Sequence, residues 1–453
     1  MKKLIKKLEE RFDEKQLLIG DDVKALEPDW FGDPCSAFAV LFPRTTDEVS
    51  QCLRLCHKYR VPVVTQGGNT GVVGGTRTDD KSLLLSLDKM DQIEELDLSA
   101  RTMTVQAGIK LQTVQEAARQ NNLTFCLDLG ARGSATIGGN IATNAGGNRV
   151  LRYGMMREQV LGIEVVLADG QVLNHMSKVL KDNTGYDWKH LFIGSEGTLG
   201  VITRAVLRLH PELPSTQTAL LGLRSSQELA QLYLNLDRSL GGRLCAFEVM
   251  WQDFFILAAS DKQNPLSQGY PLYVLVESEG ADDETDKEQL TQAIEKLLRN
   301  GLIEDAVLAQ SSRERDALWA IRDNIDALKV LDNPYSYDVS VPVSELDEYL
   351  NNLKTRLLTQ FPGYRSAIFG HYGDSNIHLF IGGISDAQQE EVDEFVYGLL
   401  PPQSSISAEH GIGATKRAWL CQSRSPAEIE MMKQLKKTLD PKNILNPGKL
   451  FMS

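Results

Sequence analysis

Apolar positions in the first half of the chain change repeatedly between helical spacing and short apolar runs. Apolar residues from position 49 to 59 recur every three or four positions, and Thr45 followed by Glu48 is typical of a helix start. The pattern predicts a further helix at 111–121 and strands at 61–64, 83–85, 103–107, 160–170 and 201–209. The first half is therefore expected to alternate helices and strands.

The pattern changes after residues 211–214. Glycine becomes less frequent, and charged amphipathic helices are predicted at 286–299 and 344–358. A final helix is predicted at 426–439. We therefore expect a domain boundary near residue 212.

Two glycine-rich stretches stand out in the first half. Residues 66–76 follow a predicted strand directly, and successive N–H groups freed by glycine form a nest suited to pyrophosphate. Residues 133–140 have the same chemistry, and 142–147 can contact a flat ring through backbone. One such stretch is typical of an ordinary turn, whereas two favour a cofactor site. Neither fits GxGxxG opening a Rossmann unit or GxxxxGK[ST], which argues against a nicotinamide or P-loop site.

Two motifs in the second half carry histidines. Residues 371–378 place His371 and His378 around a Gly-Asp-Ser-Asn turn, and residues 407–413 contain Glu409 and His410. Two histidines and a carboxylate leave coordination positions open for substrate, as catalytic zinc sites do. The remaining histidines are scattered and are interpreted as ordinary core or surface residues: His57, His175, His190 and His210.

Composition narrows the class of protein. A length of 453 residues predicts more than one packed region, and a net charge of −13 argues against a nucleic-acid partner. No run of 18 apolar residues predicts a transmembrane span, and the basic N-terminus is interpreted as an amphipathic helix. The six cysteines form no CxxC pair, so we expect reduced thiols in a cytoplasmic protein.

The glycine-rich stretches, together with residues 182–187 and 191–200, resemble the FAD-binding domain of the vanillyl-alcohol oxidase and p-cresol methylhydroxylase flavoprotein superfamily. The resemblance covers nearly the whole chain. It implies an α+β fold, with a two-subdomain FAD-binding domain and an α+β cap domain containing an antiparallel sheet. The implied parts are an N-terminal helical segment (1–34), the FAD-binding domain (35–211), the substrate or cap domain with the metal site (212–420) and a C-terminal segment returning to the FAD domain (421–453).

The resemblance also implies the residues that contact FAD. Residues 66–76 contain no His or Cys and Cys126 lies just outside the second stretch, so the flavin is expected to be non-covalent. The expected contacts are Gln66, Gly67, Gly68, Asn69, Thr70, Gly71, Gly74, Gly75, Thr76, Gly130, Ser134, Ile137, Gly138, Gly139, Asn140, Thr143, Asn144, Gly146, Gly147, Tyr153, Gly200, Val201 and Asn446.

The histidine motifs resemble the metal-containing branch of this superfamily, which includes D-lactate and D-2-hydroxyglutarate dehydrogenases. On that resemblance His371, His378 and Glu409 bind a divalent metal. Zinc is preferred for N and O donors, and manganese and iron remain alternatives. His410 is expected to be the general base, and Arg322 resembles the arginine that grips the substrate carboxylate. The implied reaction moves a hydride from C2 of a D-2-hydroxy acid to flavin N5.

The chain departs from the hydroxyglutarate enzymes at three aligned positions, which hold Asp326, Ser336 and Phe380. An aspartate repels a second carboxylate, the serine supplies no positive charge, and the phenylalanine adds apolar surface. A D-lactate-like monocarboxylate is therefore slightly favoured over D-2-hydroxyglutarate.

Three other activities are kept as alternatives: a D-2-hydroxyglutarate dehydrogenase, an oxidase that passes electrons to oxygen, and a non-catalytic flavin-binding module. A dehydrogenase needs an electron acceptor, which is expected to be an electron-transfer flavoprotein, a quinone or a cytochrome. The other expected partner is the small 2-hydroxy-acid substrate, and a homodimer is also considered.

Overall fold

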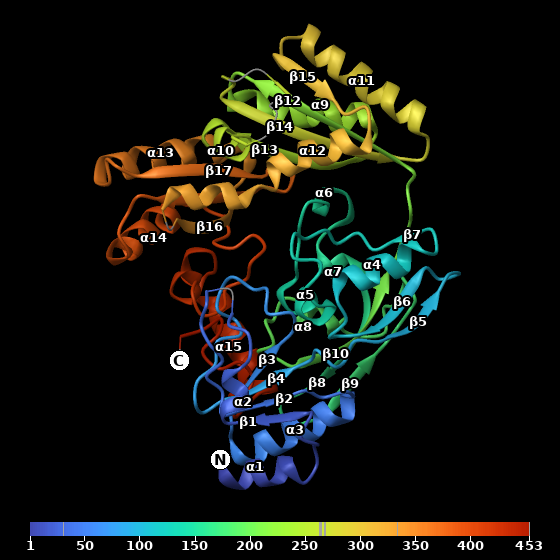
Figure 1. Ribbon diagram of the computed structural model, residues 1–453, viewed down its shortest axis with the longest axis vertical. Coiled ribbons are helices and arrows are strands. Elements are labelled where there is room, and N and C mark those ends of the chain that lie inside the picture. The colour runs from blue at the N-terminus through green and yellow to red at the C-terminus, as the bar shows by residue number, and fades with distance from the viewer. Residues whose placement is uncertain (30, 262–264, 267–268, 333, 453) are drawn as a thin grey trace. The chain divides into compact units, whose positions relative to one another are not determined.

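The computed structural model describes residues 1–29, 31–261, 265–266, 269–332 and 334–452, which form two compact units (Figure 1). Unit 1 comprises residues 1–147, 154–212 and 409–453, and unit 2 comprises residues 148–153 and 213–408. The predicted division into four parts stays a prediction. Within the described ranges, no helix combines the length and the apolar character needed to cross a membrane.

Unit 1 is built on two main sheets. The first has the order β1-β2-β4-β3, in which β2 and β3 run parallel to β4 and β1 runs antiparallel to β2. The apolar faces of helices α1 and α3 pack together beneath it and contribute Leu4, Leu8 and Cys52 to its core. The bounds are α1 (Lys2–Glu9), β1 (Leu17–Ile19), α2 (Asp21–Lys24), β2 (Ala39–Leu41), α3 (Thr46–Tyr59), β3 (Val63–Gln66) and β4 (Leu83–Ser86).

The second sheet of unit 1 is antiparallel, with the order β5-β6-β10-β8-β9. A two-stranded ladder of β7 and β11 lies beside α4, and the buried residues of α4 and α5 complete the core of this sheet. The bounds are β5 (Ile93–Asp97), β6 (Thr102–Gln106), α4 (Leu111–Arg119), β7 (Leu123–Thr124), α5 (Ile137–Thr143), α7 (Met156–Gln159), β8 (Val160–Val166), β9 (Val172–His175), α8 (Lys189–Phe192), β10 (Val201–Arg208), β11 (His210–Pro211) and α15 (Pro426–Leu439).

The second glycine-rich stretch differs from its predicted form. No helix was predicted there, whereas residues 137–143 form helix α5. Thr136 caps this helix by accepting a hydrogen bond from the N–H of Gly139 through its hydroxyl. The cap and the burial of Ile137 and Ile141 in the core outweigh the low helix propensity of two adjacent glycines.

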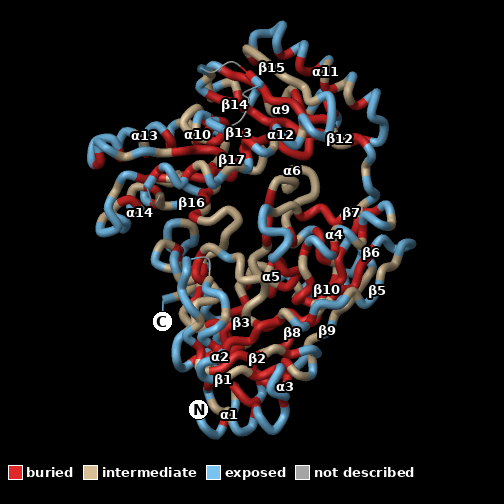
Figure 2. The backbone as a smooth tube through the Cα atoms, viewed as in Figure 1, coloured by how far each residue is buried: buried red, intermediate tan, exposed pale blue. Residues whose placement is uncertain are grey.

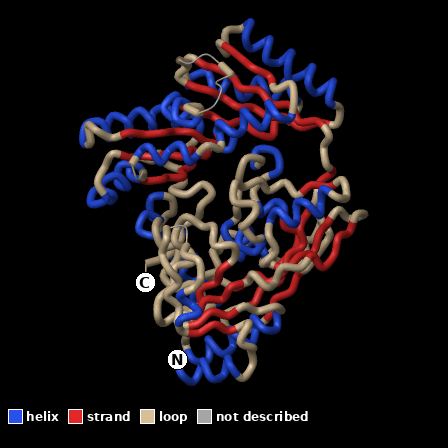
Figure 3. The backbone as a smooth tube through the Cα atoms, viewed as in Figure 1, coloured by secondary structure: helices blue, strands red, loops and turns tan. Residues whose placement is uncertain are grey.

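Unit 2 contains one antiparallel sheet of seven strands, in the order β15-β12-β14-β13-β17-β18-β16. The central strand β13 is buried along its whole length, because helices cover both faces of the sheet (Figures 2 and 3). The strand bounds are β12 (Ser215–Leu223), β13 (Leu244–Trp251), β14 (Leu272–Gly280), β15 (Asp305–Leu308), β16 (Tyr335–Ser340), β17 (Arg365–His371) and β18 (Asn376–Gly382). The α+β class, with an antiparallel sheet in the second half, is confirmed.

One face of this sheet packs against α10, α12 and the 3-10 helix η2, which share a core with Met250, Tyr273 and Phe369. Side chains alternate along a strand, so residues two apart share this face. The remaining bounds in unit 2 are α6 (Val150–Tyr153), α9 (Leu229–Leu240), α10 (Gln252–Ala258), α11 (Asp283–Arg299), α12 (Ser312–Arg322), η2 (Ile325–Leu331), α13 (Leu346–Gln360), η4 (Tyr372–Asp374) and α14 (Gln389–Gly398).

Candidate functional site

A cavity of about 380 Å³ opens in unit 1. Its wall includes residues of the two glycine-rich stretches, residues 196–197 and 200–202, Glu409 and His410, and Asn446. The predicted cofactor residues in this wall are Gly67, Gly68, Asn69, Thr70, Gly71, Gly75, Thr76, Gly130, Gly138, Gly139, Asn140, Thr143, Gly146, Gly200, Val201 and Asn446. One cavity thus gathers segments that are far apart in the sequence.

Glycine is required in this wall for two different reasons. A Cβ on Gly67 would lie 2.2 Å from Thr136 Oγ1, and one on Gly68 would lie 2.0 Å from the Ser134 carbonyl oxygen, so the two stretches meet only because side chains are missing. Gly71 and Gly75 instead face open space, with no neighbouring atom within 4 Å of a built Cβ. Such a bare backbone leaves room for a pyrophosphate, and these residues fit FAD.

The other predicted cofactor residues lie outside the cavity wall. Ile137 is buried in the core of unit 1, and the Asn144 side chain accepts a hydrogen bond from the Arg157 N–H. Tyr153 belongs to unit 2, where its hydroxyl donates to Glu279 Oε2 at 2.7 Å. The residues outside the wall are Gln66, Gly74, Ser134, Ile137, Asn144, Gly147 and Tyr153.

Glu409 and His410 both line the cavity, which places them beside the predicted flavin site within unit 1. The Gly147 N–H donates to Glu409 Oε1 at 2.8 Å, so the second glycine-rich stretch orients this carboxylate. Glu196 was not predicted as a site residue, although it lines the same cavity. The signals in the sequence were its position in the Gly-Ser-Glu-Gly turn at 194–197 and the resemblance of residues 191–200 to the FAD-binding domain.

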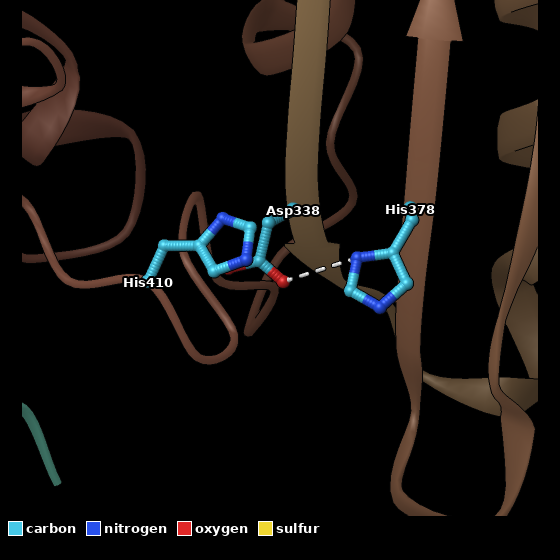
Figure 4. A group of neighbouring side chains, drawn as sticks. All are labelled: Asp338, His378 and His410. Atoms are coloured by element: carbon cyan, nitrogen blue, oxygen red, sulfur yellow. Dashed lines mark ion pairs between the residues drawn. The ribbon is translucent and has the colours of Figure 1, made fainter. Parts of the chain in front are cut away.

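His371 and His378 come together in unit 2. They lie on the paired strands β17 and β18, with ring centroids 5.3 Å apart and planes inclined at 81°. Both side chains are buried. Asp338 on β16 is the direct cross-strand partner of His378, and its Oδ1 forms an ion pair with His378 Nδ1 at 3.8 Å (Figure 4). A carboxylate at Nδ1 is typical of histidines that bind metals through Nε2.

Glu248 stands beside His371 as Asp338 stands beside His378. Glu248 was not among the site residues predicted from the sequence. It is the cross-strand partner of His371 on β13, it is 1% exposed, and its Oε1 lies 2.7 Å from His371 Nδ1. If Nδ1 donates the proton to Glu248, Nε2 keeps the lone pair that a metal ligand needs. The one signal in the sequence was a charged residue inside an otherwise apolar strand.

Glu248 also binds Arg322, whose Nε donates to Glu248 Oε2 at 2.8 Å. Arg322 is 6% exposed, its Nη2 lies 3.2 Å from His371 Nε2, and its Cζ lies 5.0 Å above the Phe369 ring. One carboxylate therefore holds both the predicted carboxylate-binding arginine and a predicted metal ligand. Burial alone raises the pKa of Glu248, but its interactions with His371 and Arg322, including a hydrogen bond from each, outweigh the burial and lower the pKa to about 2.

The lowered pKa predicts how the Glu248→Gln variant responds to pH. A carboxyl group with a depressed folded-state pKa stabilises the fold above its unfolded value of 4.5, and that contribution is lost as pH falls towards 2. We expect the variant to be less stable than the parent at pH 7, by on the order of 3 kcal/mol. The difference between their urea unfolding midpoints should shrink between pH 5 and 2. If the difference between the two midpoints stays constant over this pH range, Glu248 is not ionised in the folded protein.

The three positions at which the chain departs from hydroxyglutarate enzymes are placed differently from one another. Asp326 is 84% exposed and pairs with Lys329 at 2.6 Å, so it lies on the surface. Ser336 is exposed and is the cross-strand partner of Phe380. Phe380 is half-buried and stacks on Phe369 with ring centroids 5.9 Å apart. The structure therefore gives no support for repulsion between Asp326 and a second substrate carboxylate. The preference for a monocarboxylate depends on Phe380.

The match to known families covers most of the chain. Residues 37–175 match the FAD binding domain family, and residues 213–450 match the C-terminal domain family of FAD linked oxidases. The structure of p-cresol methylhydroxylase with substrate bound superposes with a TM-score of 0.75, covering 100% of this chain and 97% of that one at 15% identity. This likeness shows the fold.

Two relatives show more closely which enzymes this chain is similar to. The rat protein named D-2-hydroxyglutarate dehydrogenase, mitochondrial (Rattus norvegicus) is 40% identical over 437 residues, covering 95% of this chain and 81% of the relative. A fission yeast protein (Schizosaccharomyces pombe) named putative D-lactate dehydrogenase, mitochondrial, is 37% identical over 444 residues, covering 94% of this chain and 84% of the relative.

The fold and the cavity define an FAD-dependent oxidoreductase of the vanillyl-alcohol oxidase and p-cresol methylhydroxylase superfamily. Within it, the chain belongs to the family of FAD-dependent 2-hydroxy-acid dehydrogenases that includes D-2-hydroxyglutarate and D-lactate dehydrogenases. The predicted superfamily, its D-lactate and D-2-hydroxyglutarate dehydrogenase branch and the enzyme class are confirmed.

The predicted cytoplasmic location is wrong by the same comparison. Several D-2-hydroxyglutarate dehydrogenases among the relatives are named as mitochondrial proteins. The prediction rested on cysteine usage, which indicates whether disulfides hold a fold together. It does not distinguish one reducing compartment from another.

Proposed function

We propose that this enzyme oxidises a D-2-hydroxy acid to the 2-oxo acid with the help of a divalent metal, and that a D-lactate-like monocarboxylate is slightly favoured. The observation that carries the proposal is the position of Glu409 and His410 in the wall of the cavity that fits FAD. Bound FAD supplies the acceptor for the hydride that leaves C2 of the substrate.

His371, His378 and Glu409 are proposed as the metal ligands. Support comes from the paired imidazoles of unit 2, each with a carboxylate at Nδ1, and from the Gly147 N–H that orients Glu409. Zinc is preferred for two nitrogen donors and one oxygen donor. Metal coordination lowers the pKa of the substrate hydroxyl.

His410 is proposed to remove the proton from that hydroxyl as the hydride departs. Arg322 is proposed to hold the substrate carboxylate. A guanidinium group binds a carboxylate through two parallel N–H bonds, and Glu248 fixes the orientation of this one through its Nε. Together these contacts hold C2 and the hydroxyl in one orientation.

The face that carries Arg322 favours an apolar substrate side chain. The stacked rings of Phe369 and Phe380 lie on the same sheet face as His371 and His378, because side chains two apart on a strand point the same way. The two phenylalanine rings themselves offer a second carboxylate neither a hydrogen bond nor a positive charge. D-2-Hydroxyglutarate is kept as the second candidate because the rat relative carries that name.

Phe380→Asn is expected to shift the substrate preference. An amide at this position donates to a distal carboxylate, so kcat/KM for D-2-hydroxyglutarate should rise relative to D-lactate by roughly tenfold. Phe380→Leu is the matched control, since it keeps the surface apolar and should preserve the parent ratio. An unchanged ratio in both variants would show that the substrate side chain does not contact this position.

A panel of D- and L-2-hydroxy acids with an artificial electron acceptor tests the proposed function. We expect D-isomers to reduce the flavin, D-lactate to be turned over at least as efficiently as D-2-hydroxyglutarate, and a chelator to abolish turnover. A failure of every 2-hydroxy acid to bleach the flavin would favour the non-catalytic flavin-binding module. Peroxide formed in step with turnover would favour the oxidase.

Non-covalent FAD is proposed because residues 66–76 contain no side chain that attaches flavin. The physiological acceptor is proposed to be an electron-transfer flavoprotein, a quinone or a cytochrome, which the reoxidation kinetics of the reduced enzyme distinguish. A homodimer stays a prediction that sedimentation tests.

A further inference from the structure

The Glu196 carboxylate faces the segment of unit 1 that follows His410. Its Oε1 accepts a hydrogen bond from the Ile412 N–H at 2.8 Å, and its Oε2 accepts one from the Gly413 N–H at 2.7 Å. The bonded residues are 216 and 217 positions from Glu196 in the sequence. Both carboxylate oxygens are therefore committed to holding one short piece of backbone.

The backbone of Glu196 is itself held on two sides. Its φ of 52° lies in the left-handed region, which is unfavourable for a residue with a side chain. The N–H donates to the Ala142 carbonyl at 2.8 Å, and the carbonyl accepts from Asn446 Nδ2 at 2.6 Å. Such a conformation persists where the surroundings determine it more than once, often at functional sites. Glu196 thus offers a fixed carboxylate.

The segment that Glu196 holds has little conformational restraint of its own. Gly411 and Gly413 have positive φ values of 85° and 52°, which glycine adopts freely. A Cβ on Gly413 would lie 2.2 Å from the Val73 carbonyl oxygen, so the close approach to the first glycine-rich stretch requires glycine here. Because glycine costs conformational entropy on folding, contacts from outside are needed to hold this segment in one conformation. The Glu196 carboxylate supplies two of them, and the Leu450 N–H supplies another by donating to the Gly413 carbonyl at 3.1 Å.

We propose that Glu196 is a positioning residue that fixes the His410 imidazole in the cavity wall by clamping the Ile412 and Gly413 amides. This role rests on the proposed function of His410 as the general base. Glu196 lies in the 194–197 turn, more than two hundred residues before Ile412 in the sequence. Its carboxylate would therefore set the geometry of the base without touching the substrate. Small displacements of a positioned catalytic group lower rates steeply.

Glu196→Gln is the variant that tests this proposal in the FAD-loaded enzyme. Glutamine keeps the size of the side chain, but it offers one carbonyl acceptor and one NH2 group, so only one of the two amides keeps its partner. Glu164→Gln is the matched control. Glu164 is also buried in unit 1, it accepts from Thr46 Oγ1 and Asn174 Nδ2 at 2.6 Å, and it does not line the cavity.

Two readouts are needed. Hydrogen exchange of the peptide covering residues 410–415 reports the clamp, and the rate of flavin reduction by D-lactate under anaerobic conditions reports its effect. We expect Glu196→Gln to accelerate exchange at Ile412 and Gly413 and to slow flavin reduction by roughly ten- to a hundredfold with a smaller change in KM. Glu164→Gln should leave both readouts near the parent values, and Glu196→Asp should partly restore the reduction rate.

Each contrary outcome has a distinct meaning. If the amides of Ile412 and Gly413 exchange without protection in the parent enzyme, Glu196 does not hold them and the proposal fails. This measurement needs no variant, so it tests the proposal even if Glu196→Gln does not fold. Faster exchange with an unchanged reduction rate would overturn the positioning role. Failure of the proposed function is read separately, from a His410→Ala variant that still reduces flavin at the parent rate.

Discussion

Replacing His410 with alanine is expected to lower the rate of flavin reduction by a 2-hydroxy acid by roughly a hundredfold or more while FAD stays bound. The imidazole lines the cavity of unit 1, but most of the contacts expected for FAD come from backbone in the two glycine-rich stretches. Flavin absorbance after gel filtration should therefore match the parent protein. Metal content should be retained as well, because His410 is not among the proposed ligands.

His190→Ala is the control for this variant. His190 lies in the same unit on α8, it is 41% exposed, and it does not line the cavity. Its loss should leave the reduction rate close to that of the parent. A His410→Ala enzyme that turns over as fast as His190→Ala would remove His410 from the mechanism and require another base.

Replacing His371 with alanine is expected to remove the metal and the activity together. His371 is one of two proposed imidazole ligands, and Glu248 holds its Nδ1 at 2.7 Å so that Nε2 can bind an ion. Without Lewis-acid help the substrate hydroxyl keeps its high pKa, so turnover should fall by roughly a thousandfold or more. Elemental analysis should show less than one metal per flavin, and added zinc should not restore the rate.

A histidine–carboxylate pair outside the site provides the control. His175 Nε2 lies 3.3 Å from Asp182 Oδ2 at a solvent-exposed position of unit 1, so His175→Ala removes a similar pair without touching the proposed ligands. Metal content and turnover should both be unaffected by this change. Full metal occupancy in His371→Ala would refute the ligand assignment, even if activity were lost.

The two variants also separate the two proposed roles. Loss of turnover with the metal retained is expected of a base, whereas loss of turnover with loss of the metal is expected of a ligand. A single pattern shared by both variants would mean that one of the roles is assigned to the wrong residue. The same preparations can be assayed for peroxide, which keeps the oxidase alternative under test.

Much of the fold followed from local sequence. The last helix spans Pro426–Leu439, the bounds predicted from the sequence, and in the structure Ser425 and Glu428 form a capping box at its start. The strands predicted at 83–85 and 201–209 are β4 and β10, and the helix predicted at 286–299 lies within α11. These features depend on residues close together in the chain, and a periodic pattern reports such features well.

The glycine-rich stretches were also readable, because a run without side chains cannot fill a core and must let another group approach. The helix within the second stretch was not predicted. Residues 137–143 contain two adjacent glycines, and only a cap from Thr136 and burial of Ile137 against the second sheet make them a helix. Both stabilising contacts depend on the fold around the segment, so local propensity gave the wrong answer there.

The sequence by itself determined the candidate chemistry: two histidines around one turn, a glutamate followed by a histidine, and two glycine-rich stretches. Only the tertiary structure decided which carboxylates support those groups. Glu248 faces His371 because β13 and β17 pair in one register, and Glu196 reaches Ile412 across more than two hundred residues. The sequence gives the chemical type of each side chain directly. Which other side chains it contacts depends on strand register and on how distant segments pack together, and the spacing of residues within a motif specifies neither.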